Sequence, residues 1–261
     1  MTTKSILKSF QETGNYMCFT ISVEKKVKEA IKDYLTSNEG VQMEFDFDDD
    51  FYLVSGFSHP KLPIIKQASI TLSEWGLIPS FAFNSDFANE MQAKTLNARS
   101  DKIHETRSYK KPIISQRCIL VVDGFFESQD VNGKKFPHYI YPVDGKVFYL
   151  GCIYNLWTDK ETGEVRDTFS IITTDANKLM SRIHNLKRRM PLILHHEDIA
   201  DWINPETPIE KINKVMVPFN DDEMAAHSIS KNANKSWEIR NYPGIKDEVK
   251  YPELNSEQSL F

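Results

Sequence analysis

The sequence predicts a single α+β domain, and three observations lead to that class. Apolar and β-branched runs dominate the chain from residue 51 onward, as is typical of strands. Short turn signals separate several of these runs, so the strand pairing should be mostly antiparallel. Segments with helical patterns or capping signals occur before and after these runs. No repeat or low-complexity linker divides the 261 residues, so a single domain is expected.

A short strand and a helix are expected first. Residues 18–22 form a brief apolar run, which we interpret as a strand. Apolar residues then recur at helical spacing with lysines between them, which predicts an amphipathic helix. These residues are Val23, Val27, Ile31 and Leu35.

The strands expected next belong to one sheet system. They are the runs at 51–54, 113–126, 138–143, 146–157 and 167–174. Asn132-Gly133 and Asp144-Gly145 each predict a tight hairpin turn, and residues 159–163 predict a longer one.

Helices and a tail are expected to complete the chain. Residues 175–183 begin with a capping signal, and 197–203 and 208–217 have the pattern of short helices. The segment 241–261 is polar and contains two prolines, so we expect a loosely held tail.

The composition is that of a soluble globular protein. With 40% apolar residues, 26% charged residues and a mean hydropathy of -0.45, the chain is neither collagen-like nor largely disordered. Its apolar runs are far shorter than the roughly 20 residues of a membrane helix. The first sixteen residues lack the apolar core of a secretory signal, and three scattered cysteines fit a reducing compartment. We therefore expect a cytoplasmic protein without membrane contacts.

The charge is distributed unevenly along the chain. The net charge of -5 by itself argues against a nucleic-acid partner. However, residues 94–117 contain seven basic and two acidic residues, whereas residues 44–50 contain five acids. An acidic protein of this kind can still present a positive surface to phosphate.

Cys18 is a candidate nucleophile because Met17 precedes it. A lone cysteine is more often a small buried hydrophobe than a reactive group. If translation starts at Met17, or if a leader is cut there, loss of the methionine leaves an amine beside the thiol. An α-amine has a pKa of about 7.7 to 8.0, so part of it is neutral near pH 7 and able to attack an aldehyde.

Two further segments carry candidate polar residues. Asn97 and Arg99 are two positions apart and point the same way on an extended chain, and the guanidinium fork matches phosphate oxygens. The alternative is a solvated loop. Glu127 ends an apolar run at 121–126, where it either reaches solvent or faces a pocket. In a pocket, desolvation would raise its pKa and suit it to proton transfer.

His184 lies close to a cluster of cations. Lys187, Arg188 and Arg189 add to a positive field, although a structural histidine beside a solvated turn is the alternative. The run 195–197 (HHE) resembles a metal-binding fragment without a third ligand at a telling spacing. We therefore expect neither a metal nor another cofactor.

Five short motifs occur in the order seen in a known family. They are Met17-Cys18, WGLIPS at 75–80, NARS at 97–100, GFFE at 124–127, and Ile183-His184 followed by RMP at 189–191. In this order they resemble the SRAP family, the SOS-response-associated peptidases or abasic-site processing proteins. The resemblance covers residues 17 to about 234, so we expect an extension at 1–16, a domain at 17–240 and the tail at 241–261.

The resemblance implies a fold and a set of site residues. The fold would be a curved, barrel-like β core flanked by short helices, with a positive cleft for single-stranded DNA that contains abasic sites. The catalytic residues would be Cys18, Asn97, Glu127 and His184. The DNA-binding residues would be Asn97, Arg99, Trp75, Pro79, Ser80 and Arg189, with residues 75–80 forming a wall for bases or the flipped sugar.

The resemblance also implies a chemistry. The Cys18 amine would condense with the ring-opened sugar aldehyde, and the thiol would close a thiazolidine ring on the same carbon. Glu127 and His184 would move protons, and β-elimination from the imine would give a lyase side activity. Residues 1–16 would either precede the true start at Met17 or be removed by self-cleavage. We expect a monomer that associates with the nucleoid during DNA damage.

Two other functions remain open on the sequence. One is a thiol peptidase in which His184 activates Cys18. The other is a noncovalent module for single-stranded nucleic acid, in which the basic segment and the aromatic residues provide the binding.

Overall fold

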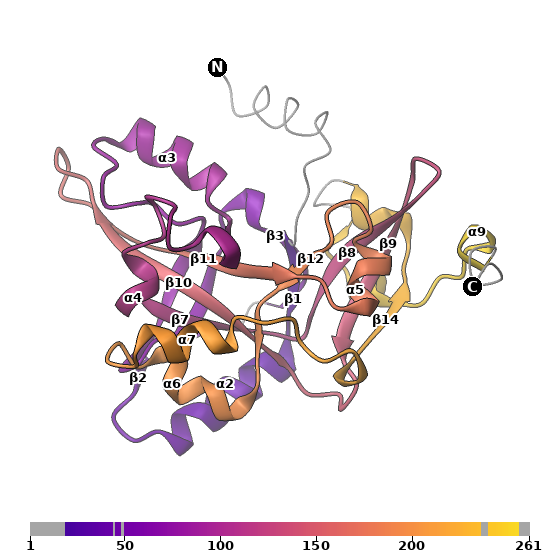
Figure 1. Ribbon diagram of the computed structural model, residues 1–261, viewed down its shortest axis with the longest axis horizontal. Coiled ribbons are helices and arrows are strands. Elements are labelled where there is room, and N and C mark those ends of the chain that lie inside the picture. The colour runs from indigo at the N-terminus through magenta and orange to yellow at the C-terminus, as the bar shows by residue number, and fades with distance from the viewer. Residues whose placement is uncertain (1–18, 44, 48–49, 236–239, 256–261) are drawn as a thin grey trace.

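The computed structural model describes residues 19–43, 45–47, 50–235 and 240–255 (Figure 1). Within these residues, five strands close into a barrel. The barrel strands are β4 (Lys61–Ile65), β5 (Ser69–Trp75), β7 (Arg117–Val122), β10 (Phe148–Thr158) and β11 (Val165–Asp175). Neighbours pair antiparallel in the order β11-β10-β7-β4-β5, and β5 returns to pair parallel with β11. The predicted α+β domain with a mostly antiparallel, barrel-like core is thereby confirmed.

A second sheet lies beside the barrel. Its strands, in spatial order, are β14 (Met224–Ser228), β9 (Lys134–Pro142), β8 (Gly124–Val131), β1 (Thr20–Val23) and β3 (Phe51–Ser55). The chain passes from barrel strand β7 to sheet strand β8 with only Asp123 between them. The apolar runs therefore belong to two sheets, whereas a single sheet system was predicted.

Short strands and helices cover the two sheets. The remaining strands are β2 (Gln42–Met43), β6 (Asn97–Arg99), β12 (Arg189–Pro191) and β13 (Ile193–Leu194). The α-helices are α2 (Lys25–Ser37), α3 (Ser85–Lys94), α4 (Pro112–Ser115), α5 (Lys178–Ile183), α6 (Ile199–Ile203), α7 (Ile209–Val215) and α9 (Pro252–Asn255). Single 3₁₀ turns occupy Gly56–Ser58, Ser100–Lys102, His196–Asp198, Asp221–Glu223, Lys231–Asn234 and Pro243–Lys246. None of the described helices is long and apolar enough to span a bilayer.

The helix predicted after the first strand is confirmed. Helix α2 buries Val27 and Ile31 against the core, as the lysine-separated spacing indicated. By contrast, residues 113–126 do not form one strand. Pro112 begins the short helix α4, where its missing N–H costs nothing, and strand pairing starts only at Arg117. Helix α3 was not predicted.

Two of the three predicted hairpin turns are confirmed. Asn132 and Gly133 adopt φ values of 52° and 78° and join β8 to β9, and residues 159–163 join β10 to β11. The turn at Asp144-Gly145 also forms, with φ of 72° at Gly145, but it joins strands of different sheets. A two-residue signal specifies the bend locally, whereas the strand partners depend on long-range packing.

The first part of the predicted tail is packed, so the expectation of a loosely held segment is wrong there. Ile245 is fully buried in a small cluster with Leu53 and Tyr139. The Lys246 ammonium pairs with the Glu24 carboxylate, which ties the tail to the residue before α2.

Candidate active site

Glu127 and His184 form a buried acid–base pair. Glu127 is 8% exposed on β8, and His184 is 4% exposed just after α5, with 3.9 Å between Glu127 Oε2 and His184 Nε2. His184 Nδ1 donates to the Arg189 carbonyl at 2.8 Å, because a carbonyl oxygen only accepts. Nε2 is therefore the nitrogen directed at the carboxylate. At 3.9 Å the two groups are too far apart for a direct hydrogen bond to each other.

Helix α5 fixes the position of the histidine. The Asn177 side chain caps the helix start by accepting from the Met180 amide at 2.8 Å. At the other end, the His184 amide donates to the Met180 carbonyl at 2.7 Å, so His184 closes the last turn. Figure 1 shows α5 lying beside β8, the strand that carries Glu127.

The first described strand pairs with the strand that carries Glu127. Ile21 on β1 is the antiparallel partner of Phe125 on β8, two residues before Glu127. Met17 and Cys18 lie outside the described residues, so the structure gives no position for the predicted nucleophile.

His138 is a third buried polar residue at this position, and the sequence reasoning missed it. It is the cross-strand partner of Glu127 on β9 and is 8% exposed. Burial is the main cause that lowers its pKa, and its Nδ1 donates to the Phe136 carbonyl at 2.9 Å. Burial therefore disfavours the charged form of this ring beside Glu127. The sequence around His138 has the pattern of an ordinary strand, and nothing in it indicated that this histidine lies opposite Glu127.

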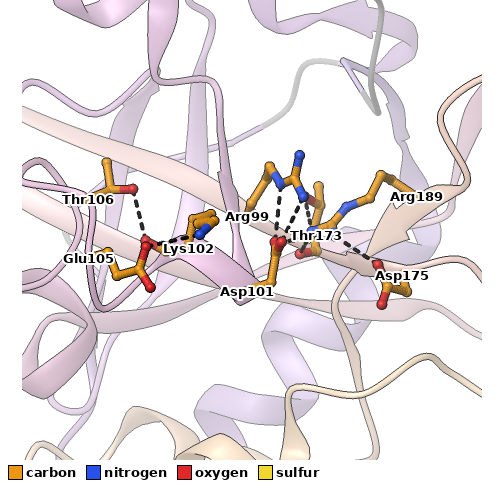
Figure 2. A network of polar contacts seen from close by, with 8 residues as sticks. All are labelled: Arg99, Asp101, Lys102, Glu105, Thr106, Thr173, Asp175 and Arg189. Carbon is orange, nitrogen blue, oxygen red and sulfur yellow. Dashed lines mark hydrogen bonds and ion pairs between the residues drawn. The ribbon is translucent and has the colours of Figure 1, made fainter.

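A row of charged side chains lies across β6, β11 and β12 (Figure 2). Arg99 donates two hydrogen bonds to the Asp101 carboxylate, from Nε at 3.1 Å and from Nη2 at 2.6 Å. Arg189 Nη1 reaches Asp101 at 3.4 Å and Asp175 at 3.0 Å. Hydrogen bonding from Arg99 is the main cause that lowers the pKa of Asp101, which stays ionised between the two arginines.

A basic pocket of about 390 Å³ opens beside this row. It is lined by Arg99, Asp175, Ala176, Ser181, Lys187, Arg188 and Arg189. Four cations face one carboxylate there, which suits an anion with several oxygens such as a phosphate. We call these seven residues the basic pocket.

The predicted DNA-binding arginines differ in their exposure. The Arg99 side chain is 51% exposed, whereas that of Arg189 is 5% exposed and is anchored by Nη2 to the Thr173 carbonyl at 2.5 Å. Arg189 therefore lines the basic pocket with a side chain that is held by Thr173, Asp175 and Asp101. It presents little surface for direct contact, contrary to the predicted role.

Asn97 lies on the strand that carries Arg99. Strand β6 pairs parallel to β11, and Ala98 between the two polar residues is fully buried, so Asn97 and Arg99 share a face as predicted. The Tyr109 hydroxyl donates to the Asn97 carbonyl at 3.0 Å. This contact holds the half-buried Asn97 at the end of the barrel.

The predicted aromatic wall is wrong for Trp75 and Pro79. Trp75 is fully buried, its ring stacks on Phe169 inside the barrel, and its Nε1 donates to the Leu96 carbonyl at 2.9 Å. Pro79 is also buried, which leaves only Ser80 exposed. The apolar residues of this motif are all buried, so they offer no exposed face on which a base can stack.

The basic segment at 94–117 contributes less positive surface than its charge suggests. Arg117 is 1% exposed and donates to backbone carbonyls, including that of Ile113 at 2.9 Å. Lys94 and Lys102 are paired with nearby glutamates. Arg107 lies over the ring of Phe81 at 4.1 Å. Of the basic residues in this segment, Arg99 lines the basic pocket, and Lys110 and Lys111 are also exposed.

No metal centre is found in the described part of the chain, where no three His, Cys, Asp or Glu side chains are grouped as ligands. His195, from the run that resembles a metal-binding fragment, stacks on Phe219 and lies 3.7 Å from Glu223.

The fold and site define a class of protein: an α+β barrel with a buried carboxylate and imidazole beside a basic pocket. Residues 17–236 match the family model described as "SOS response associated peptidase (SRAP)". The chain belongs to the SRAP family, which confirms the resemblance seen in the sequence.

Known relatives and solved structures agree with this assignment. The chain is 33% identical over 210 residues to "Abasic site processing protein YoqW" of Bacillus subtilis (strain 168), covering 73% of this chain and 90% of that protein. It is 33% identical over 181 residues to "Abasic site processing protein HMCES" of Gallus gallus, covering 61% of this chain and 52% of that protein. A crystal structure of a protein from Bacteroides thetaiotaomicron is 36% identical, with a TM-score of 0.80 over 89% of this chain and 100% of that one.

Proposed function

We propose that this protein processes abasic sites in DNA by covalent capture through an N-terminal Cys18. The observation that carries the proposal is the buried Glu127–His184 pair, which lies beside the basic pocket and whose carboxylate stands on the strand that pairs with β1. Cys18 is the residue directly before Phe19 in the chain. The printed names of YoqW and HMCES as abasic site processing proteins support the same substrate.

The first chemical step is imine formation. An abasic deoxyribose opens to an aldehyde, and the Cys18 amine attacks its C1′ carbon. The resulting carbinolamine loses water, and the leaving hydroxyl needs a proton. Glu127 and His184 donate this proton, which leaves with the water, and accept a proton from the nitrogen. General acid–base catalysis of this kind accelerates a step by typically about 10²- to 10⁴-fold.

The second step closes the ring. The Cys18 sulfur bonds to C1′, and the thiol proton ends on the nitrogen, so a five-membered thiazolidine forms without an oxidant. The net reaction releases one water. Elimination of the 3′ phosphate from the imine is a competing path and gives a lyase side activity.

The active chain needs a free amine at Cys18. In the printed sequence this nitrogen is in a peptide bond with Met17. We propose that the active form begins at Cys18, either after removal of an initiating Met17 or after self-cleavage that releases the preceding residues. Self-cleavage would be the peptidase activity in the family's description.

The basic pocket would hold the strand. Arg99, Lys187 and Arg188 are exposed around it and face phosphate oxygens, while Arg189 adds its field from inside. Aromatic stacking on Trp75 plays no part, so affinity for single strands depends on backbone contacts and salt concentration. We propose that the protein acts in the cytoplasm as a monomer on damaged DNA.

The test is denaturing electrophoresis with intact mass spectrometry. Protein beginning at Cys18 is mixed with a single-stranded oligonucleotide that carries one abasic site. We expect an adduct with the mass of protein plus DNA minus one water, and none with an oligonucleotide that lacks the site. Cys18→Ser keeps the amine but lacks the sulfur, so its adduct should not survive denaturation.

The competing functions give different outcomes. No adduct from a verified Cys18 terminus, with tight salt-sensitive binding, would support a noncovalent module instead. Turnover of added peptides that is lost in Cys18→Ser would support a thiol peptidase acting in trans.

A further inference from the structure

The loop between His184 and Arg189 carries an exposed apolar side chain two residues after His184. Leu186 is 63% exposed, and Lys187 and Arg188 after it are exposed as well, between the buried residues at each end of the loop. We propose that Leu186 fills the gap left by the missing base and packs against the neighbouring base. Lys187 and Arg188 then hold the adjacent phosphate. This inference rests on the proposed function and names how the same site would recognise its lesion.

The loop is held in a defined shape although its tip is exposed. Asn185 makes two bonds to the Asp130 backbone, accepting from its amide at 3.1 Å and donating to its carbonyl at 2.7 Å. The Arg188 amide donates to the His184 carbonyl at 2.8 Å, and the Ala176 amide donates to the Arg188 carbonyl at 3.0 Å. These contacts fix the base of the loop against β8 and the end of β11.

The backbone of Arg188 also indicates that the loop has a defined shape. It adopts a φ of 50°, in the left-handed region that costs energy for a residue with a side chain. In this conformation the carbonyl of Arg188 bonds to Ala176 while its side chain lines the basic pocket. The loop is therefore constrained at the position where its cations meet the pocket.

The position of Leu186 follows from chain geometry. Its Cα lies at most about 7 Å from that of His184, because only two residue steps separate them. His184 Nε2 is 3.9 Å from Glu127, and the following residues Lys187 and Arg188 reach the basic pocket. Along the chain, Leu186 thus stands between His184 of the proposed reaction centre and the two cations of the proposed phosphate site.

An apolar tip between these sites fits an abasic strand. A missing base leaves a gap in the stack and exposes the face of the next base to water. Apolar side chains such as leucine insert at base steps in many DNA-binding proteins. A leucine there gains contact area with an abasic strand, whereas an intact base would have to be displaced first. The same loop would therefore favour the damaged strand over an undamaged one.

The test measures reversible binding in a Cys18→Ala background, where no thiazolidine can form. The oligonucleotides are single-stranded, with or without one abasic site, and carry 2-aminopurine beside that position. We expect Leu186→Ala to weaken binding to the abasic strand by roughly tenfold. We also expect it to remove the change in 2-aminopurine fluorescence and to leave binding of the intact strand nearly unchanged.

Leu156→Ala is the matched control, because Leu156 is 54% exposed on β10 and does not line the basic pocket. It should bind both strands as the background protein does. Equal affinity and an equal fluorescence change for Leu186→Ala and Leu156→Ala would overturn the inference. The wild-type adduct assay is run in parallel, so failure of capture itself is seen separately from failure of the Leu186 contact.

Discussion

Asp123 offers a quantitative test of the packing between the barrel and the second sheet. It joins β7 to β8, is 7% exposed, and its Oδ2 accepts from the Glu24 amide at 2.6 Å. Burial is the largest cause that raises the pKa of Asp123 from 3.8 to about 6. The charge of Glu24 also raises it, while the Glu24 hydrogen bond and Lys246 act in the opposite direction. The folded protein therefore binds this proton more tightly than the unfolded chain does.

The sign and size of the effect follow from this difference. A pKa of about 6 in the folded state against 3.8 in the unfolded state corresponds to roughly 3 kcal/mol. This stabilisation is fully present below about pH 4 and is lost as the pH rises through 6. Asp123→Asn keeps an acceptor for the Glu24 amide but carries no charge. The variant should therefore be more stable than the wild type at pH 7.5, by up to about 3 kcal/mol, with a smaller difference near pH 4.

The assay is urea unfolding at pH values from 4 to 8. The expected result is a free energy of unfolding that falls more steeply with pH in the wild type than in Asp123→Asn. Asp222→Asn is the control, because Asp222 is exposed and should leave the pH profile unchanged. Parallel profiles for the wild type and Asp123→Asn would refute the assignment of a buried, proton-binding carboxyl at this position.

Three further predictions concern the site and its support. Asn177→Ala removes the cap of α5 and should cost about 1 kcal/mol of unfolding free energy in urea titrations; an unchanged midpoint would contradict the capping role. Gly124→Ala places a Cβ 2.4 Å from the Ile140 carbonyl, so thermal melts should show a loss of about 1–3 kcal/mol, and a wild-type melt would refute this contact. Arg99→Ala should lower the salt slope of DNA binding by about 1, whereas Lys94→Ala should not, and equal slopes would exclude a phosphate contact at Arg99.

Local patterns predicted the elements whose structure depends on local sequence. The spacing of Val27 and Ile31 predicted α2, and Asn132-Gly133 predicted the β8–β9 hairpin. The Asp144-Gly145 turn formed without a hairpin, because the partner of β9 on its other side is β14, from much later in the chain. Pairing between distant strands has no signal in a short window of sequence.

Short motifs identified several site residues, but they did not predict which residues from distant segments come together. Glu127 and His184 were identified from separate motifs, but their approach depends on α5 packing beside β8. Trp75 was assigned to the DNA surface because a motif does not reveal which way a side chain faces, and in this fold it faces the barrel interior. The place of Asp101 between Arg99 and Arg189 depends on β6 and β12 both flanking β11, which no local pattern predicts.

The most direct test of the proposed capture is to locate the linkage on the protein. The adduct is digested with a protease and a nuclease, and the peptide that carries the sugar remnant is sequenced by tandem mass spectrometry. The proposed mechanism predicts the remnant on the peptide that begins with Cys18, with both the amine and the sulfur modified. A remnant on a lysine such as Lys187, with the Cys18 peptide unmodified, would contradict it.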